Sequence, residues 1–268
     1  MKNELAKGIT KLTPSFQELT PDIALLRLAL VNACLVGDKN GWILVDAGPE
    51  TSAGFIVNSS LQRFGKDHPP GAIFLTHGHS DHAGAALQLA ELWDVAVYAH
   101  ELEIPYITGK KSYPLATSDS SEKLAAKTTN LGYRVAALPP DGSLPGINGW
   151  RWLHTPGHTE GHVCFYRDLD RALIVGDAFT TARQPSLWPA LPQDGNSKNP
   201  PTYLVTDWAA AGRSMGKIRA LKPDLAIPGH GAPMKGDKLA RYLEMLFLHF
   251  EGISVPEHAQ YGSSFTNH

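Results

Sequence analysis

The stretch "THGHSDH" at residues 76–82 is the feature that most constrains what this chain can fold into. Three histidines and an aspartate fall close together there: His77, His79, Asp81 and His82. Apolar runs flank them, "IFL" at 73–75 and "AGAALQLA" at 83–90, which is not typical of a solvated surface loop. Imidazoles and carboxylates beside a core must be hydrogen-bonded or coordinated, because an unpaired polar group inside a protein costs free energy. We therefore interpret these side chains as metal ligands.

Single His or Asp residues stand at four other places where a short apolar run ends. The runs "LVDAG", "PGH", "VGD" and "IPGH" carry Asp46, His158, Asp177 and His230. The ends of neighbouring strands can converge on one edge of a sheet, where loops build functional sites. Glycines beside His158 and Asp177 permit tight turns that direct these side chains to a common point. We expect all five places to meet at one edge.

The spacing within the first stretch suits two metal ions. His77 and His79 are two residues apart, so an extended backbone points both imidazoles to the same side. Asp81 and His82 open the next expected helix, where an aspartate interacts favourably with the helix dipole. Imidazole and carboxylate ligands without thiolate are typical of zinc, iron or manganese in open catalytic sites.

The hydrophobic periodicity predicts strands alternating with helices, which is typical of an α/β fold. Strands are expected at 23–36, 42–48, 71–77, 94–100, 150–158, 162–168, 171–179 and 224–231. Helices are expected at 52–65, 80–93, 121–131, 207–221 and 238–253. Ser80 is a candidate N-cap for the helix at 80–93.

We expect one domain over residues 1–268. The turn-rich stretch 138–150 separates two pseudo-halves, about 1–140 and 150–268. Two irregular stretches, 106–130 and 183–203, are candidate walls of a substrate pocket, since long loops beside a rigid site often cover it. Trp188, in the second stretch, is a candidate pocket residue.

The charge pattern argues against nucleic-acid and membrane partners. The formal net charge is −2 and no basic run stands out, whereas nucleic-acid-binding proteins usually carry a basic patch. The sequence has neither the roughly 18–20 apolar residues of a bilayer span nor the apolar centre of a signal peptide. Cys34 and Cys164 lie in apolar stretches and are expected to be buried thiols. We expect a cytoplasmic protein with a small-molecule substrate; the apolar final helix is compatible with a homodimer.

The ordered motifs resemble those of the metallo-β-lactamase superfamily. The matching stretches are "LVDAG" at 44–48, "THGHSDH" at 76–82, "PGHTEGH" at 156–162, "VGDAF" at 175–179 and "IPGHG" at 227–231. They occur in the order typical of that family and span most of the chain. The resemblance implies a four-layer αββα sandwich with two divalent metal ions at one sheet edge, zinc foremost and iron or manganese as alternatives.

The resemblance also implies a role for each motif residue. The first ion would be bound by His77, His79 and His158, and the second by Asp81, His82 and His230. Asp177 would bridge the two ions. Asp46, Thr76 and His162 are expected to hold the ligands in place by hydrogen bonds or packing rather than to bind metal.

The expected chemistry is hydrolysis. Two divalent ions about 3.5–4 Å apart can share a water molecule and lower its pKa, so that it is a hydroxide at neutral pH. By resemblance, this metal-bridging hydroxide would attack a carbonyl or phosphoryl centre, and Asp81 would move a proton to the leaving group. The sequence therefore predicts a metal-dependent hydrolase of a small ester, lactone or thioester.

Three groups of relatives can be weighed by their departures from this pattern. True β-lactamases of this fold lack the bridging aspartate, so Asp177 argues against that activity. Hydroxyacylglutathione hydrolases hold glutathione with basic residues in a C-terminal helical region, where this chain offers only Lys238 and Arg241. Many acyl-homoserine lactonases carry a tyrosine three residues after the bridging aspartate. This chain has Thr180 there, a candidate pocket residue.

Other classes of function stay open as alternatives. A mononuclear iron dioxygenase acting on glutathione persulfide would use His77, His79, His158 and Asp177. A phosphodiesterase or nuclease would use the full ligand set, but the near-neutral charge and the missing basic arm count against tRNA processing. A non-catalytic binding module is disfavoured by the completeness of the ligand set.

Overall fold

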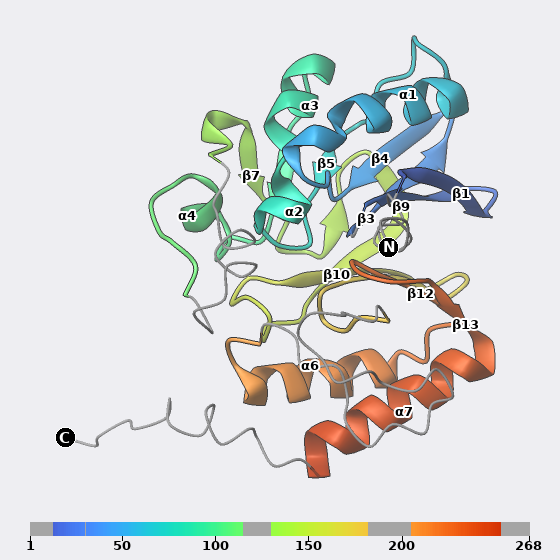
Figure 1. The fold of residues 1–268 in the computed structure, drawn as a ribbon, viewed down its shortest axis with the longest axis vertical. Helices are drawn as coiled ribbons and strands as arrows, with labels where there is room; N and C mark the ends of the chain where they lie inside the picture. Colours follow the sequence, from blue (N-terminus) through green and yellow to red (C-terminus); the bar gives the residue numbers. More distant parts are fainter. Residues whose placement is uncertain (1–12, 30, 115–129, 182–204, 253–268) are drawn as a thin grey trace, which may run out of the picture.

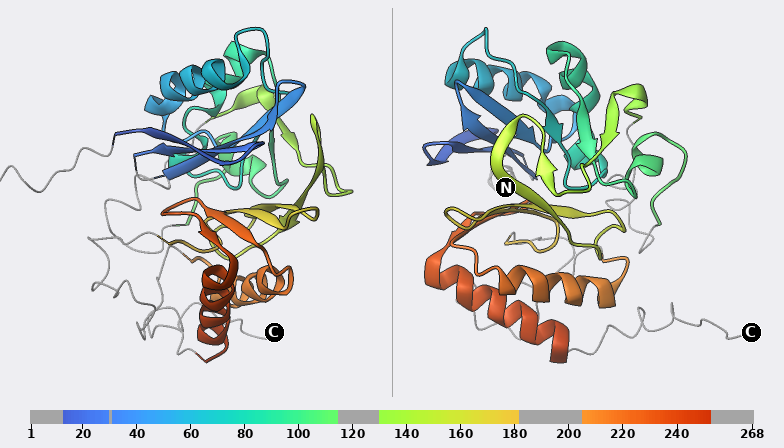
Figure 2. Two further views of the ribbon diagram at one scale, coloured as in Figure 1. Left: turned by 90° about the vertical axis from the view of Figure 1, so that its right-hand side faces the viewer. Right: turned by 180° about the vertical axis from the view of Figure 1, so that it is seen from behind.

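The computed structural model describes residues 13–29, 31–114, 130–181 and 205–252. Within these residues the chain forms two β-sheets that face each other, with helices on both outer faces (Figures 1 and 2). Helices α1 and α3 cover the first sheet, and α6 and α7 cover the second. The αββα sandwich expected from the resemblance is confirmed.

The first sheet has the strand order β1-β2-β3-β4-β5-β6-β7. Its strands are β1 (Ser15–Thr20), β2 (Ile23–Leu28), β3 (Val31–Asp38), β4 (Gly41–Val45), β5 (Ile73–Phe74), β6 (Val97–Ala99) and β7 (Val135–Ala137). The first four strands pair antiparallel, and β4 to β7 pair parallel. Parallel pairing brings the carboxyl ends of β4, β5 and β6 to the same edge.

The second sheet has the order β13-β12-β11-β10-β9-β8. Its strands are β8 (Ser143–Leu144), β9 (Ile147–His154), β10 (Val163–Arg167), β11 (Ala172–Gly176), β12 (Leu225–Pro228) and β13 (Met234–Lys235). Here β11 and β12 pair parallel, so their carboxyl ends also share an edge. The chain passes from one sheet to the other between β7 and β8, inside the turn-rich stretch noted in the sequence.

The described helices connect and cover these strands. They are α1 (Ala53–Phe64), α2 (Ser80–Ala83), α3 (Ala86–Trp93), α4 (Ile104–Ile107), α6 (Trp208–Ala220) and α7 (Gly236–Gly252), with 3₁₀ turns η1 (Glu50–Ser52) and η2 (Gly132–Arg134). The helices expected at 52–65, 207–221 and 238–253 correspond to α1, α6 and α7. None of the described helices is both long and apolar enough to cross a bilayer.

Three clusters of buried side chains fill the spaces between the four layers. One lies between the first sheet and α1 and α3, one between the two sheets, and one between the second sheet and α6 and α7. Successive side chains of a strand point to opposite faces of the sheet. In β2, Leu25 therefore belongs to the cluster between the sheets and Leu26 to the cluster under α1 and α3. Phe74 of β5 stacks on Tyr98 and meets Phe165 of the opposite sheet edge-on. Burying each such side chain contributes about 1.5–3 kcal/mol.

Two details of the sequence prediction are wrong, and four strands were not expected: β1, β7, β8 and β13. The expected helix at 80–93 is broken into α2 and α3 around Gly84, where the backbone passes close to η1; a Cβ there would lie 2.6 Å from the Glu50 amide nitrogen. Ser80 is the first helical residue, and His79 is at the N-cap without a side-chain capping bond. The polar strand β1 was not expected, because its exposed side chains lack an apolar alternation.

The two sheets are joined directly at the edge where β5 and β12 end. The backbone N–H of Asn32 donates to the carbonyl of Gly229 at 2.7 Å, and that of Val163 donates to the carbonyl of Thr76 at 2.9 Å. The Asn32 amide group also donates to the carbonyls of Pro228 and Gly231, both at 2.8 Å. The expected metal ligands lie at this edge, each shortly after the end of its strand.

Candidate metal centre

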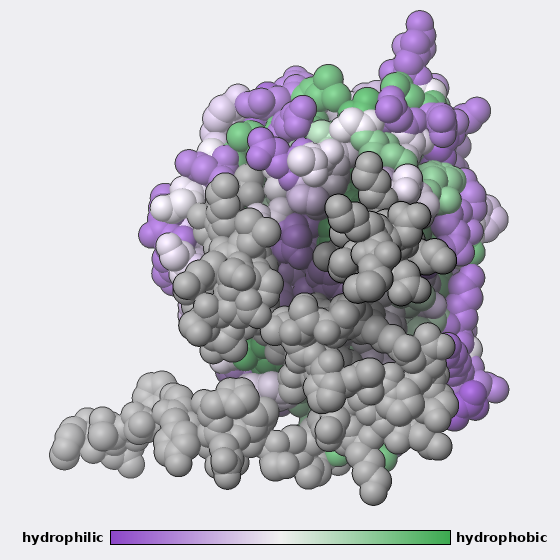
Figure 3. Space-filling view, in the orientation of Figure 1, coloured by the Kyte–Doolittle hydropathy of each residue, from purple (hydrophilic) through white to green (hydrophobic). Residues whose placement is uncertain are grey.

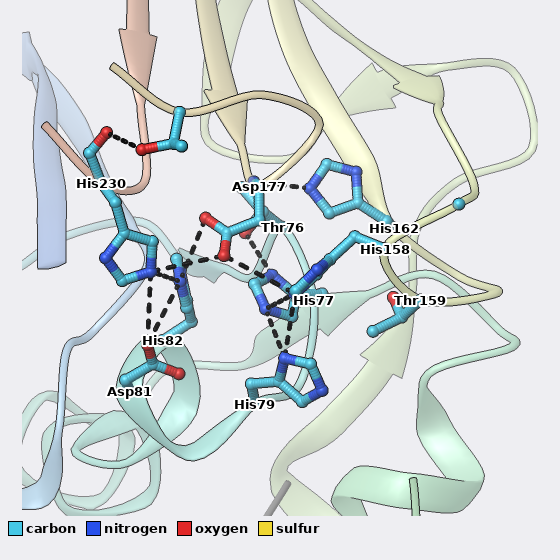
Figure 4. A network of polar contacts seen from close by, with 12 residues as sticks. Thr76, His77, His79, Asp81, His82, His158, Thr159, His162, Asp177 and His230 are labelled. Atoms are coloured by element: carbon cyan, nitrogen blue, oxygen red, sulfur yellow. Dashed lines mark hydrogen bonds and ion pairs between the residues drawn. The ribbon is translucent and has the colours of Figure 1, made fainter. Parts of the chain in front are cut away.

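Three histidines from two sheets bring ring nitrogens to one point. His77 and His79 follow β5, and His158 follows β9. The Nε2 atom of His77 lies 3.1 Å from Nδ1 of His79, and Nε2 of His158 lies 3.1 Å and 3.0 Å from these two atoms. All three residues are buried. The structure therefore brings together the three residues that the sequence predicts for a first ion (Figure 4).

The surroundings keep two of these imidazoles neutral. Burial, with neighbouring histidines, lowers the pKa of His77 well below its usual range. Burial, with the neighbouring His158, lowers the pKa of His79 to about 3. A neutral imidazole offers a lone pair, which is the form that binds metal.

A second group lies beside the first. Asp81 and His82 come from α2 and His230 from the loop after β12, and their ligand atoms lie close enough to share an ion. Nε2 of His230 is 3.4 Å from Oδ2 of Asp81 and from Nε2 of His82. The Asp81 side chain is 33% exposed, whereas that of His82 is fully buried. These are the residues that the sequence predicts for a second ion.

Asp177, directly after β11, lies between the two groups (Figure 4). Its Oδ2 atom is 3.6 Å from Nε2 of His158 and 3.3 Å from Nε2 of His230. Its Oδ1 atom is 3.5 Å from Nε2 of His82. A Cβ on Gly229 would overlap Asp177 and His82, so glycine is required for this approach. The position between the groups is the one that the bridging role predicts.

The second group favours positive charge. Burial opposes protonation of His82, but the carboxylates of Asp177, Asp81 and Asp46 outweigh it and raise its pKa well above the usual range. Likewise, burial lowers the pKa of His230, but Asp177 and Asp81 raise it to about 10. Several carboxylates thus converge where a cation would satisfy them.

Asp46 and Thr76 hold His82 and the 76–82 stretch. Asp46, directly after β4, accepts hydrogen bonds from the Thr76 backbone at 2.8 Å and the Thr76 hydroxyl at 2.9 Å. Its Oδ2 atom lies 2.9 Å from Nδ1 of His82, so that nitrogen carries the proton and Nε2 faces the group. Asp46 is in the left-handed region, with φ +58°, which aspartate tolerates better than most residues. Both residues make the contacts expected of them.

His162 supports the backbone of Asp177. Its Nε2 atom accepts the N–H of Asp177 at 2.9 Å, and its Nδ1 atom lies 3.1 Å from the carbonyl of Thr155. Both ring nitrogens of His162 are therefore occupied by hydrogen bonds to backbone groups and are not available to a metal ion. A Cβ on Gly176, with φ +55°, would lie 2.7 Å from His162, so the glycine of "VGD" allows this contact.

The remaining candidates lie at different places. The hydroxyl of Thr180 donates to the carbonyl of His230 at 2.8 Å, so this side chain holds the His230 loop and is buried. Trp188 and the whole stretch 183–203 lie outside the described residues. So do residues 115–129 of the stretch 106–130, and with them most of the helix expected at 121–131. Figure 3 shows a hydrophilic recess in the surface above α2, the helix that carries Asp81 and His82.

Two residues at this edge were missed by the sequence reasoning. Glu103 is fully buried and accepts hydrogen bonds from both histidine-bearing loops. Asn32 holds the loop that carries His230. The sequence offers only an indirect signal for Glu103. The glycines of "HGH" and "TEGH" leave room for its carboxylate to approach the backbone.

The side chains present fit divalent cations. On a tetrahedral zinc ion, neighbouring nitrogens stand about 3.3–3.4 Å apart, close to the separations among the three imidazoles. Among the described residues, Oδ1 of Asp81 and Oδ1 of Asp177 are buried with no hydrogen-bond partner. Such oxygens are costly inside a protein unless a cation is nearby. The described residues contain three overlapping groups with the spacing of metal ligands.

The αββα sandwich, with clustered His and Asp side chains at one sheet edge, indicates that this protein is a metallo-hydrolase. The sequence profile of the Metallo-beta-lactamase superfamily matches residues 26–230. The chain is 44% identical over 210 residues to the probable metallo-hydrolase YflN of Bacillus subtilis (strain 168), covering 75% of this chain and 80% of that protein. This chain belongs to the metallo-β-lactamase superfamily.

Two further similarities bear on the chemistry. Over 151 residues, the chain is 29% identical to hydroxyacylglutathione hydrolase of Francisella tularensis subsp. novicida (strain U112), covering 55% of this chain and 47% of that protein. The crystal structure of TTHA1623 in a di-iron-bound form is 27% identical, with a TM-score of 0.55 over 87% of this chain and 96% of that one.

Proposed function

We propose that this protein is a hydrolase of a small ester, lactone or thioester that works with two divalent metal ions. The observation that carries the proposal is the Asp177 carboxylate, which lies within 3.3–3.6 Å of ligand nitrogens from both groups. A carboxylate placed between two groups of ligand atoms can contact an ion in each group, and adjacent ions of this kind are typical of two-metal hydrolases. The relatives named as a hydroxyacylglutathione hydrolase and as a di-iron protein support the thioester class and the ion pair.

Bound divalent ions supply activation of water and polarisation of a substrate oxygen. The chain supplies the remaining functions. Asp46 and His162 fix the orientation of His82 and of the Asp177 backbone. Asp81, whose side chain is partly exposed, is the group that would pass a proton to the leaving atom. Buried glycines and threonines keep the loops at this edge in one arrangement.

The first experiment is metal analysis of the purified protein together with hydrolysis assays on ester, lactone and thioester panels. We expect about two ions per chain and turnover of at least one class. His79→Ala and Asp177→Ala are expected to abolish turnover with the fold retained. Asp168→Asn, which changes an exposed carboxylate paired with Arg151, is the control.

Wild-type rates from both ligand variants would refute the proposal. One iron per chain, with oxygen consumption on a persulfide, would assign the mononuclear dioxygenase activity instead. Cleavage of a phosphodiester would assign the phosphodiesterase alternative. Zinc as the resident metal, a homodimer and a cytoplasmic location are further parts of the proposal, tested by metal analysis, sedimentation and cell fractionation.

A further inference from the structure

Glu103 is a fully buried glutamate that contacts the two loops carrying the three-histidine group. It follows β6 and is at the N-cap position of α4. Its Oε2 atom accepts the N–H of Gly78 at 2.9 Å, and Gly78 separates His77 from His79. Its Oε1 atom accepts the Thr159 hydroxyl at 2.6 Å and the N–H of Gly161 at 3.0 Å. One carboxylate therefore joins the two loops that carry the first group.

We propose that Glu103 is a positioning residue, which sets the separation of His77, His79 and His158 and thereby the affinity of the first metal ion. The inference rests on the proposed function, since it requires that these histidines bind metal. Thr159 is next to His158, and Gly78 is next to both other histidines. A shift of either loop would therefore move a ligand nitrogen directly.

The partners of Glu103 match an ionised carboxylate. Two backbone N–H groups and the Thr159 hydroxyl donate to it, and the hydroxyl of Tyr113 is its fourth partner. An ionised carboxylate only accepts hydrogen bonds, so four donors satisfy both of its oxygens. Burial raises the pKa of the Tyr113 phenol well above its usual range, as does the charge of Glu103. Tyr113 therefore keeps its proton and donates a hydrogen bond to the carboxylate.

The sequence leaves room for this carboxylate at two glycines. A Cβ on Gly161 would lie 2.8 Å from atoms of Glu103, and a Cβ on Gly78 would overlap Tyr113 and Ile107. Larger residues would push the carboxylate away from both loops. The glycines inside "HGH" and "TEGH" are thus explained by the approach of Glu103 and its tyrosine partner.

Tyr113, a hydrogen-bond partner of Glu103, also contacts the candidate ligand His79. Its ring packs edge-on against His79 with centroids 4.6 Å apart, and it stacks on Tyr106 at 4.2 Å. The hydroxyl of Tyr106 donates to Glu160 at 2.7 Å. The Glu160 carboxylate lies on the same loop as Thr159 but pairs with Tyr106 and Lys111 rather than with the donors of Glu103, so it offers a matched control.

The test is a Zn²⁺ titration of the full chain after metal removal, followed by calorimetry, with Co²⁺ absorption as the spectroscopic reading. Glu103→Gln keeps the shape but turns an NH₂ group toward donors that need an acceptor. We expect the dissociation constant of one ion to rise about 10–100-fold and its Co²⁺ spectrum to change. The other ion, bound by Asp81, His82 and His230, is expected to change less than about twofold. Glu160→Gln is expected to behave as wild type.

The outcomes separate the inference from the proposed function. A wild-type chain that binds no ion refutes both. A wild-type chain that binds two ions, with an unchanged Glu103→Gln variant, refutes the inference alone. Equal weakening of both ions also refutes it, because that would indicate a general loss of structure. If Glu103→Gln does not fold, Thr159→Val removes one donor at similar volume and is expected to weaken the same ion by about threefold to tenfold; an unchanged affinity refutes the inference.

Discussion

Asp46→Asn tests how the chain orients His82. The carboxylate accepts the Thr76 N–H at 2.8 Å and the Nδ1–H of His82 at 2.9 Å, both within the protein interior. An asparagine oxygen can keep the Thr76 bond, but its NH₂ group then faces Nδ1 of His82. The imidazole must move its proton to Nε2, the nitrogen that faces Asp81 and His230.

The size of the effect follows from the bond that is lost. A hydrogen bond to a charged group contributes about 1.5–3 kcal/mol, and each 1.4 kcal/mol corresponds to about a tenfold change in affinity. The ion held by His82 should therefore bind about 10–100-fold more weakly, in line with other residues that orient metal ligands. The ion at His77, His79 and His158 should change less, because the nearest of these rings, His77, is linked to Asp46 through the Thr76 hydroxyl rather than by a direct hydrogen bond.

The assay is a Zn²⁺ titration of the metal-stripped variant, with circular dichroism to check the fold. Asp38→Asn is the matched control, since Asp38 is exposed at the end of β3 and its carboxylate accepts the local Asn40 N–H at 2.7 Å. Wild-type affinity for both ions in Asp46→Asn would show that this hydrogen bond does not set the state of His82. Weakening of both ions alike would also contradict the argument.

Three other predictions concern stability. Arg167→Ala should lower the free energy of unfolding by about 1.5–3 kcal/mol, because its buried guanidinium joins β10 to Asp22 in the turn between β1 and β2. Arg171→Ala, which breaks an exposed pair, should cost less than about 1 kcal/mol, and equal losses in urea titrations would contradict this. Phe74→Ala should cost about 3–5 kcal/mol, since it empties a site between the sheets; a loss under 1 kcal/mol would argue against that packing. Metal removal with a chelator should lower the thermal midpoint, with Zn²⁺ restoring it, and an unchanged midpoint would contradict ion binding by the folded state.

The sequence predicts the parts of this structure that local pattern controls. The runs around Phe74, Ile174 and Ile227 are apolar enough to indicate buried strands, and the residues just after them are where the expected ligands stand. Parallel pairing of strands then brings these ends together, which is a general property of such sheets. The shared edges of Asp46 with His77 and His79, and of Asp177 with His230, were predictable for this reason. His158 follows β9, which pairs antiparallel with β10, so its placement rests on the motif rather than on this rule.

Long-range contacts were not predictable from pattern. Glu103 lies in a short stretch with no periodicity, and its partners Gly78 and Gly161 are distant in sequence. Asn32 sits within an apolar run, where its hydrogen bonds across the sheets leave no local trace. The break at Gly84 depends on the close approach of η1, which no spacing of apolar residues records.

The edge that carries the candidate ligands is a seam, here meaning a line where direct hydrogen bonds join the two sheets. His77 and His82 belong to one side of it, and His158, Asp177 and His230 belong to the other. Neither side alone supplies all three residues of either candidate group. A small separation of the two sides would therefore pull both groups apart while the hydrogen bonds within each sheet stay intact.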